Sequence, residues 1–167
     1  TTDAGALVRN LKEEDAVKLA ADNMKTDVAA YDAKAVSEVL LVEAMSPNPL
    51  AELIINLRQD PQFGAALVLG SGGVLVELLA DTVTLLLPTR PVEIIRALKS
   101  LRVGPLLEGF RGRPAVDITK VAEEIYKLCI TFQEHMKTIV EIEINPLFVY
   151  REKVSAIDAL VQVPADK

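Results

Sequence analysis

The tightest constraint on the fold is a pair of strand-like runs near the C-terminal end of the sequence. Ile139–Tyr150 and Val154–Val163 are separated by only three residues. So short a connection can join antiparallel neighbours only, because parallel strands need a crossover of a dozen or more residues. Within the first run, VEIEIN (residues 140–145), valine and isoleucine alternate with glutamate and asparagine, so one face of the strand is apolar and the other polar.

The length of the turn sets which residues of the two runs face each other. If residues 151–152 form a two-residue turn, Tyr150 pairs with Lys153 and Asn145 lies opposite Asp158. Opposite partners share a face with Cβ atoms roughly 5 Å apart. An amide oxygen and a carboxylate at that separation can hold a hard cation such as Mg²⁺. The pattern alone favours a solvated acidic face with Asp158 bonded to the backbone, and a slip of one residue would separate the pair.

The rest of the chain has the pattern of helices and short strands separated by turn signals. One helix is expected from an Asn10 cap, supported by Glu13, to Tyr31. A second covers Pro91–Leu101, and a third starts at an Asp117 cap. The apolar stripe expected for the second helix is Val92, Ile95, Leu98 and Leu101. Further strands are expected at Val36–Met45, Leu50–Leu57, Ala65–Leu69, Val74–Leu79 and Val83–Leu87. Together these elements predict one α+β domain over residues 1–167, with helices on a largely antiparallel sheet.

Composition excludes several classes of protein. Half of the residues are apolar and a quarter are charged, as in a globular domain. The net charge of −6 argues against a nucleic-acid partner, since phosphate contacts need an excess of Lys and Arg. No apolar run approaches the roughly 18 residues of a membrane span, so no membrane partner is expected. The single cysteine, Cys129, and the lack of a secretory signal predict a cytoplasmic protein.

Four smaller features could carry chemistry, and each has a simpler structural explanation. LGSGG (residues 69–73) fits a turn better than a phosphate cradle. Residues 88–120 hold seven basic and three acidic residues; within them Arg111 and Arg113 are the anion candidates. His135 is expected at a helix end and Cys129 in the core. No catalytic residue is therefore assigned.

Six segments occur in an order that resembles a known family: TDAGALVRNL, LLVEAMSP, AELIINLRQDPQFG, LGSGGVLVELL, LLEGFRGRPAVD and EIEINPLFVY. They are similar to the ATP-grasp domain of NDP-forming acyl-CoA synthetases, the ADP-forming acetate–CoA ligase group, and more distantly to the succinyl-CoA synthetase β subunit. The similarity spans almost the whole chain, and DPQFG, LLEGFRGRP and EINPL are its most specific blocks. It implies an ATP-grasp fold, in which a nucleotide binds between two α+β subdomains.

The resemblance also implies site residues and cofactors. The strand like LLVEAM supplies a hinge beside the adenine, and residues 1–6 resemble the end of a segment that covers the phosphates, with the family's lysine and second glycine replaced by Thr1 and Ala6. The implied cofactors are ATP or ADP and Mg²⁺. Nucleotide contacts are expected at Gly5, Glu43, Ala44, Met45, Ser46 and Glu52, and metal ligands at Asn145 and Asp158, in agreement with the register above.

The implied activity is the reversible reaction of an acid, CoA and ATP to acyl-CoA, ADP and phosphate through a phosphohistidine on another domain. The expected partners are the CoA-binding and phosphohistidine domains of the same enzyme. The chain as given is expected to lack the N-terminal lobe, and so to be inactive alone, to bind ATP weakly and to self-associate through exposed strand edges. An alternative is a ligand-binding regulatory domain fused to a lysine acetyltransferase.

Overall fold

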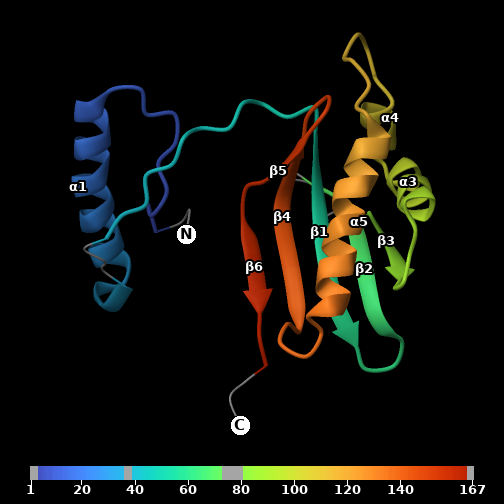
Figure 1. Cartoon of the computed structure of the whole chain (residues 1–167). Coiled ribbons are helices and arrows are strands. Elements are labelled where there is room, and N and C mark those ends of the chain that lie inside the picture. The colour runs from blue at the N-terminus through green and yellow to red at the C-terminus, as the bar shows by residue number, and fades with distance from the viewer. Residues whose placement is uncertain (1–3, 36–38, 73–80, 165–167) are drawn as a thin grey trace. The chain divides into compact units, whose positions relative to one another are not determined.

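The computed structural model describes residues 4–35, 39–72 and 81–164 (Figure 1). The chain forms two compact units, Thr1–Asn48 and Pro49–Lys167. Among the described residues, no helix is both long enough and apolar enough to span a bilayer.

The first unit contains one long helix, α1 (Glu14–Tyr31), and a short 3₁₀ turn, η1 (Ala33–Ala35). The predicted Asn10 cap is wrong, because Glu13 is the residue that precedes the helix. Asn10 instead has φ of 63°, in the left-handed region that asparagine tolerates better than most residues. The chain turns at Asn10, and the helix begins after that turn.

The strand predicted at Val36–Met45 is absent from the described part of this segment. Residues 39–45 belong to no helix or strand, and residues 36–38 lie outside the described ranges. Apolar side chains here are open to solvent: Val39, Leu41 and Val42 are 83%, 82% and 72% exposed. A β-strand is defined by the ladder that it forms with another strand, so an apolar run outside any ladder is not a strand.

The second unit is built on an antiparallel sheet, as predicted. In the described residues its six strands are β1 (Ala51–Asp60), β2 (Gly64–Ser71), β3 (Thr82–Leu86), β4 (Glu141–Val149), β5 (Val154–Ala156) and β6 (Ala159–Gln162). The order is β3-β2-β1-β4-β5, with β6 also paired to β4, and every pairing is antiparallel. The expected run Val154–Val163 is thus split in two. The expected strand Val74–Leu79 lies outside the described residues.

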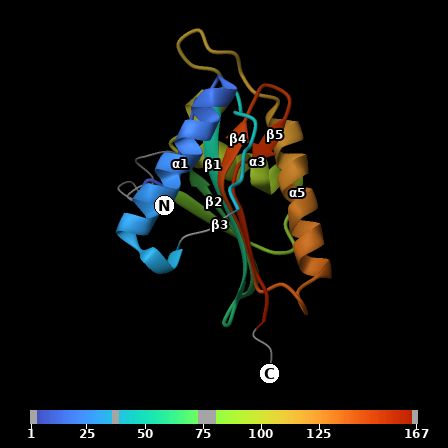
Figure 2. The ribbon, with the colours of Figure 1, turned by 90° about the vertical axis from the view of Figure 1, so that its left-hand side faces the viewer.

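Helices of the second unit lie on one side of this sheet (Figure 2). They are α3 (Pro91–Ser100), α4 (Gly104–Leu107) and α5 (Ile118–Glu134). The predicted Asp117 cap is confirmed, since its side chain accepts a 3.2 Å hydrogen bond from the Lys120 N–H. Alternate residues of β1 join the core beneath the helices, and Phe132 of α5 is fully buried there. We call the other side of the sheet the open face; on β1 it carries Glu52, Ile54, Asn56 and Arg58.

The predicted stripe of α3 is confirmed in part. Leu98 and Leu101 are buried and Ile95 packs against the core, but Val92 is 45% exposed, and Ile94 and Ala97 are buried instead. Pro91–Ser100 carries two neighbouring apolar rows, and periodicity alone does not say which row meets the sheet. Packing against α5 and the sheet selects the row through Ile94 and Leu98.

This choice of row predicts different costs for two alanine substitutions. Leu98→Ala should lower the free energy of unfolding by about 2–5 kcal/mol, because it leaves a cavity in the core. Val92→Ala should change it by no more than about 0.5 kcal/mol, because the side chain is half in solvent. Urea unfolding of the two variants measures both, and equal losses would contradict the observed burial.

Candidate functional site

The predicted register of the last hairpin is confirmed. The Tyr150 N–H donates to the Lys153 carbonyl at 2.9 Å, and the Asn145 N–H donates to the Asp158 carbonyl at 3.1 Å. Ile144 pairs with Ala159 in the same ladder. Because Ile144 is buried toward the helices, strand alternation puts its neighbour Asn145 on the open face. Asn145 thus lies opposite Asp158 along the backbone, between the pairings of β4 with β5 and with β6, and both residues are exposed.

A β-bulge interrupts β4 at this point. Leu53 of β1 pairs with Leu147 and Ile55 pairs with Ile144, so Asn145 and Pro146 together face a single residue of β1. A bulge bends its strand and re-aims a side chain, and bulges are common beside functional sites. Here it keeps two apolar residues of β4 in the core while the asparagine between them points away from it. Pro146 within a strand pattern is the sequence signal of such a bulge.

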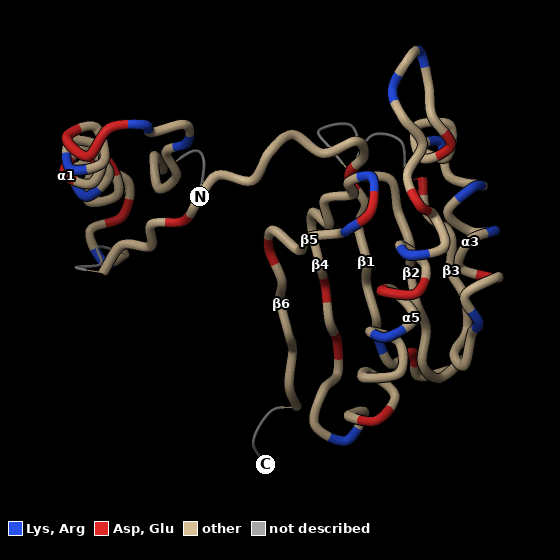
Figure 3. The backbone as a smooth tube through the Cα atoms, turned by 45° about the horizontal axis from the view of Figure 1, so that its top comes forward, with Lys and Arg blue, Asp and Glu red and all other residues tan. Residues whose placement is uncertain are grey.

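Oxygen-bearing residues follow one another along β4, and Figure 3 marks the acidic positions of this strand on the backbone. Asn56 of β1 is paired with Glu143, and its Nδ2 donates to Glu141 Oε1 at 2.5 Å. The Oδ1 atom of Asn56 is buried and has no hydrogen-bond partner among the described residues. Sequence analysis missed Asn56; the signal was a polar residue within the apolar run LIINL.

The pair Asn145 and Asp158 has the donor chemistry of a Mg²⁺ site. Both offer hard oxygen atoms, which this ion prefers. Within the described residues, no group of three or more His, Cys, Asp and Glu side chains could hold a metal. Mg²⁺ does not need such a group, because it is usually held by one or two protein ligands together with water and substrate phosphates. The residues present therefore fit Mg²⁺ better than a metal that requires an all-protein cage.

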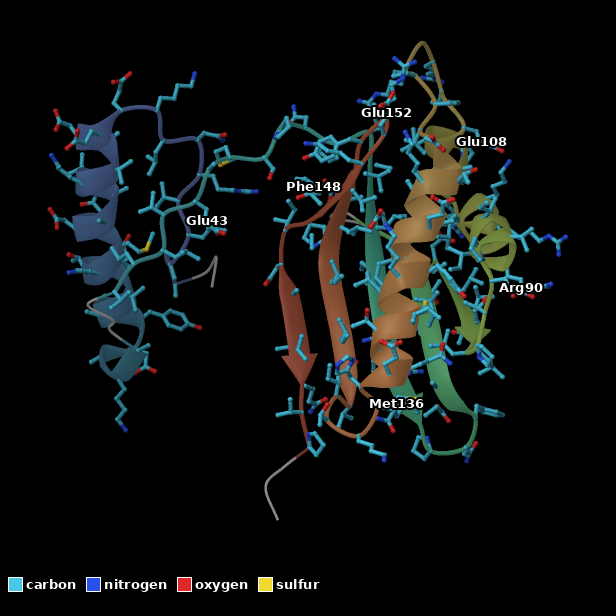
Figure 4. All side chains as sticks on the ribbon, viewed as in Figure 1. Glu43, Arg90, Glu108, Met136, Phe148 and Glu152 are labelled. Carbon is cyan, nitrogen blue, oxygen red and sulfur yellow. The ribbon has the colours of Figure 1, made fainter. Side chains whose placement is uncertain are left out.

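Glu52 lies on the same open face, at the beginning of β1. Its neighbour across the ladder is Phe148, which Figure 4 labels on β4. The side chain is partly buried, and the Glu52 carbonyl accepts a 2.7 Å hydrogen bond from the Gly72 N–H. Two of the predicted site residues, Glu52 and Asn145, thus share one face of the sheet, and the backbone of a third, Asp158, is hydrogen-bonded to that of Asn145.

The other predicted residues belong to the first unit. Gly5 has φ of +66°, and a Cβ there would come within 2.9 Å of Asp27 on α1, so only glycine fits. Glu43, labelled in Figure 4, and the neighbouring Ala44 and Met45 are exposed, while Ser46 is partly buried. Residues 40–43 and Met45 line, with α1, a cavity of about 140 Å³. That the two sets of residues form one site remains a prediction.

The remaining candidates have structural surroundings. Burial raises the pKa of the Cys129 thiol to about 12, so the thiol is not a nucleophile at neutral pH. His135 follows the last turn of α5, where its Nδ1 lies 2.8 Å from the Thr131 carbonyl oxygen. Arg111 and Arg113 are exposed in the loop between α4 and α5, and the Arg111 guanidinium stacks 5.2 Å from the Phe110 ring.

Burial of Cys129 predicts slow alkylation of the folded protein. Iodoacetamide at pH 7.5 should modify it at least about a hundredfold more slowly than an ordinary thiol, because the thiolate fraction is small. The rate should rise to the ordinary value in 8 M urea. Mass spectrometry over time measures both rates, and rapid labelling of the native protein would contradict the burial.

Comparison with known proteins gives a consistent result. The sequence model of a family described as "ATP-grasp domain" matches residues 1–163. A trans-feruloyl-CoA synthase from an unknown prokaryote is 35% identical over 97% of this chain and 23% of its own length. The β subunit of acetate–CoA ligase (ADP-forming) I from Pyrococcus furiosus is 30% identical over 95% of this chain and 67% of its own. The chain therefore spans 23% and 67%, respectively, of the lengths of these two relatives.

Solved structures agree with the sequence relatives. The dinucleotide forming acetyl-coenzyme A synthetase 1 of Ca. Korarchaeum cryptofilum, in complex with coenzyme A, Ca-AMPCP and HgCl⁺, superposes with a TM-score of 0.87. The identity is 31%, and the match covers 98% of this chain and 70% of that one. A second structure of that protein holds coenzyme A and Mg-AMPPCP, with its phosphohistidine segment pointing towards the nucleotide binding site. These relatives support the ligase interpretation and give no support to an acetyltransferase fusion.

Proposed function

Since the chain belongs to the ATP-grasp domain family, we propose that it is the nucleotide-binding portion of an acid–CoA ligase that forms ADP. The observation that carries the proposal is the position of Asp158, between β5 and β6, opposite Asn145 of β4. It follows from the turn at residues 151–152 and agrees with the metal-ligand positions that the family resemblance implies.

In this proposal Asn145 and Asp158 hold Mg²⁺, and Glu52 contacts the nucleoside. A glutamate carboxylate accepts hydrogen bonds from hydroxyl or amino groups. Backbone groups of Glu43, Ala44 and Met45 face the adenine, and Ser46 adds a hydroxyl. Gly5 belongs to the segment over the phosphates, where its lack of a side chain permits a close approach.

The charge of the open face supports a cation between protein and nucleotide. On β1 and β4 this face carries Glu52, Glu141 and Glu143 against one cation, Arg58, which is paired with Glu141, and Asp158 adds a fourth carboxylate in the proposal. A nucleotide polyphosphate would be repelled by these carboxylates. Bound Mg²⁺ neutralises charge on both sides and polarises the phosphoryl oxygens.

The work of the chain's own residues is then to position the reacting groups. Phosphoryl transfer needs in-line geometry and charge stabilisation more than covalent chemistry by the protein. Residues on paired strands suit that task, because a sheet holds them more precisely than a loop does. The step proposed for this domain is phosphoryl exchange between the nucleotide and a histidine carried elsewhere in the enzyme.

The wider properties follow from the same proposal. The whole enzyme joins an organic acid to CoA, and its partners are the CoA-binding and phosphohistidine domains. The proposal names no particular acyl group, because the relatives named above include both a feruloyl-CoA synthase and an acetate–CoA ligase. We place the enzyme in the cytoplasm, where a lone buried thiol such as Cys129 stays reduced.

The metal assignment predicts the effect of one isosteric substitution. Asp158→Asn in the full-length protein should lower the rate of ATP formation by at least about a hundredfold, because an amide is a poorer Mg²⁺ ligand than a carboxylate. A coupled assay of ATP formation from acyl-CoA, ADP and phosphate measures the rate. The matched control is Asp15→Asn, whose carboxylate on α1 is fully exposed. Unchanged turnover in Asp158→Asn would contradict the assignment.

The same assignment predicts a coupling between metal and nucleotide. Removing Mg²⁺ with EDTA should weaken ADP binding to the wild-type protein by about tenfold or more. Without the cation, the phosphates are repelled by the carboxylates of the open face. In Asp158→Asn the removal of Mg²⁺ should change the affinity much less. Calorimetric titration with and without Mg²⁺ gives the four dissociation constants. An equal loss in both proteins would place the metal elsewhere.

A further inference from the structure

A hydrogen-bonded cluster joins the end of β2 to the turn between α3 and α4. The Ser71 hydroxyl donates to Asp81 Oδ2, and the same oxygen accepts the Arg102 N–H at 2.8 Å. The Val103 N–H donates to Ser71 Oγ at 3.3 Å. The Ser71 N–H donates to the Asp81 carbonyl at 3.1 Å. We call these four residues the Ser71–Asp81 clasp.

The clasp ends directly beside Glu52. Gly72 follows Ser71 in the chain, and its N–H donates to the Glu52 carbonyl at 2.7 Å. A Cβ at Gly72 would lie 2.6 Å from the Glu52 carbonyl carbon, so no other residue fits without a shift of the backbone. The main chain at residues 71–72 is therefore pressed against the main chain of Glu52.

The other end of the clasp is anchored in the helical layer. A Cβ at Gly104 would lie 2.5 Å from the Lys99 carbonyl oxygen, so α4 begins tightly against the end of α3. Leu101 and Val103, on either side of Arg102, are buried. The two N–H groups that the clasp binds thus come from a rigid turn. Because the turn between α3 and α4 is tightly packed, hydrogen bonds to it can hold Ser71 and Gly72, and therefore the backbone of Glu52, in place.

We propose that Asp81 is a positioning residue, which acts through Ser71 and Gly72 to hold Glu52 in its nucleotide-binding place on the open face. The inference rests on the proposed function, in which Glu52 contacts the nucleotide. Asp81 itself touches no substrate. Its carboxylate brings together the Ser71 hydroxyl and the turn after α3, and this fixes the strand end that supports Glu52. A displacement of about 1 Å at a binding residue can cost orders of magnitude in function.

The test is a double-mutant cycle in the full-length protein, read by calorimetric titration with Mg-ADP. Glu52→Gln and Asp81→Ala should each raise the dissociation constant by about tenfold, equivalent to about 1.4 kcal/mol. The double variant should be no weaker than the single ones by more than about twofold, because both changes disable the same contact. Asp81→Asn keeps an acceptor oxygen for Ser71 and Arg102 and should restore most of the affinity.

Two controls separate positioning from general stability. Asp117→Ala removes the cap of α5 and should lower the melting temperature without changing the dissociation constant. If Asp81→Ala does not fold, Ser71→Ala takes its place in the cycle, since it leaves the bond from Arg102 to Asp81 intact.

The outcomes separate the positioning role of Asp81 from the proposed nucleotide-binding function on which it rests. Additive losses, about a hundredfold in the double variant, would show that Asp81 acts independently of Glu52 and would overturn the inference. An unchanged affinity for Mg-ADP in Asp81→Ala, together with a loss of affinity in Glu52→Gln, would also overturn the inference. That result would still agree with the proposed function. A wild-type protein that does not bind Mg-ADP would overturn both.

Discussion

The turn after Tyr150 is the constraint on which the open face depends. Its 2.9 Å hydrogen bond to Lys153 closes a two-residue connection, and every later pairing of β4 with β5 and β6 keeps that register. A shift by one residue would move Asp158 to the opposite face and leave Asn145 beside an apolar partner. One short local contact thus decides whether the two proposed Mg²⁺ ligands lie opposite each other.

The parts that could be predicted from the sequence are the parts that local geometry decides. Turn length determines the pairing of Asn145 with Asp158, and the cap at Asp117 depends on residues one helical turn away. The errors occur where distant segments decide. The segment before Ser46 has strand-like composition but joins no β-ladder in the described residues, and α3 has two apolar rows of which only packing selects one. The hydrogen bond between Ser71 and Val103 joins residues 32 positions apart, and no local sequence pattern predicts it.

The architecture separates stability from recognition. The helices α3 and α5 bury the apolar side of the sheet, and alternation then leaves the opposite side free to carry Glu52 and Asn145. The bulge at Asn145 and Pro146 departs from the regular ladder at the position where a ligand is proposed. An acidic face of this kind suits an anionic ligand only when a cation lies between them, so metal and nucleotide binding are expected to depend on each other.

Metal-directed backbone cleavage tests the central claim most directly. Fe²⁺ can replace Mg²⁺ at an oxygen-ligand site, and with ascorbate and peroxide it generates radicals that cut the nearby chain. In the full-length protein with ADP bound, cuts should cluster at Asn145 in the bulge of β4 and at Asp158 between β5 and β6, and excess Mg²⁺ should suppress them. Nucleotide-dependent cuts confined to other segments, with residues 145 and 158 intact, would contradict the account.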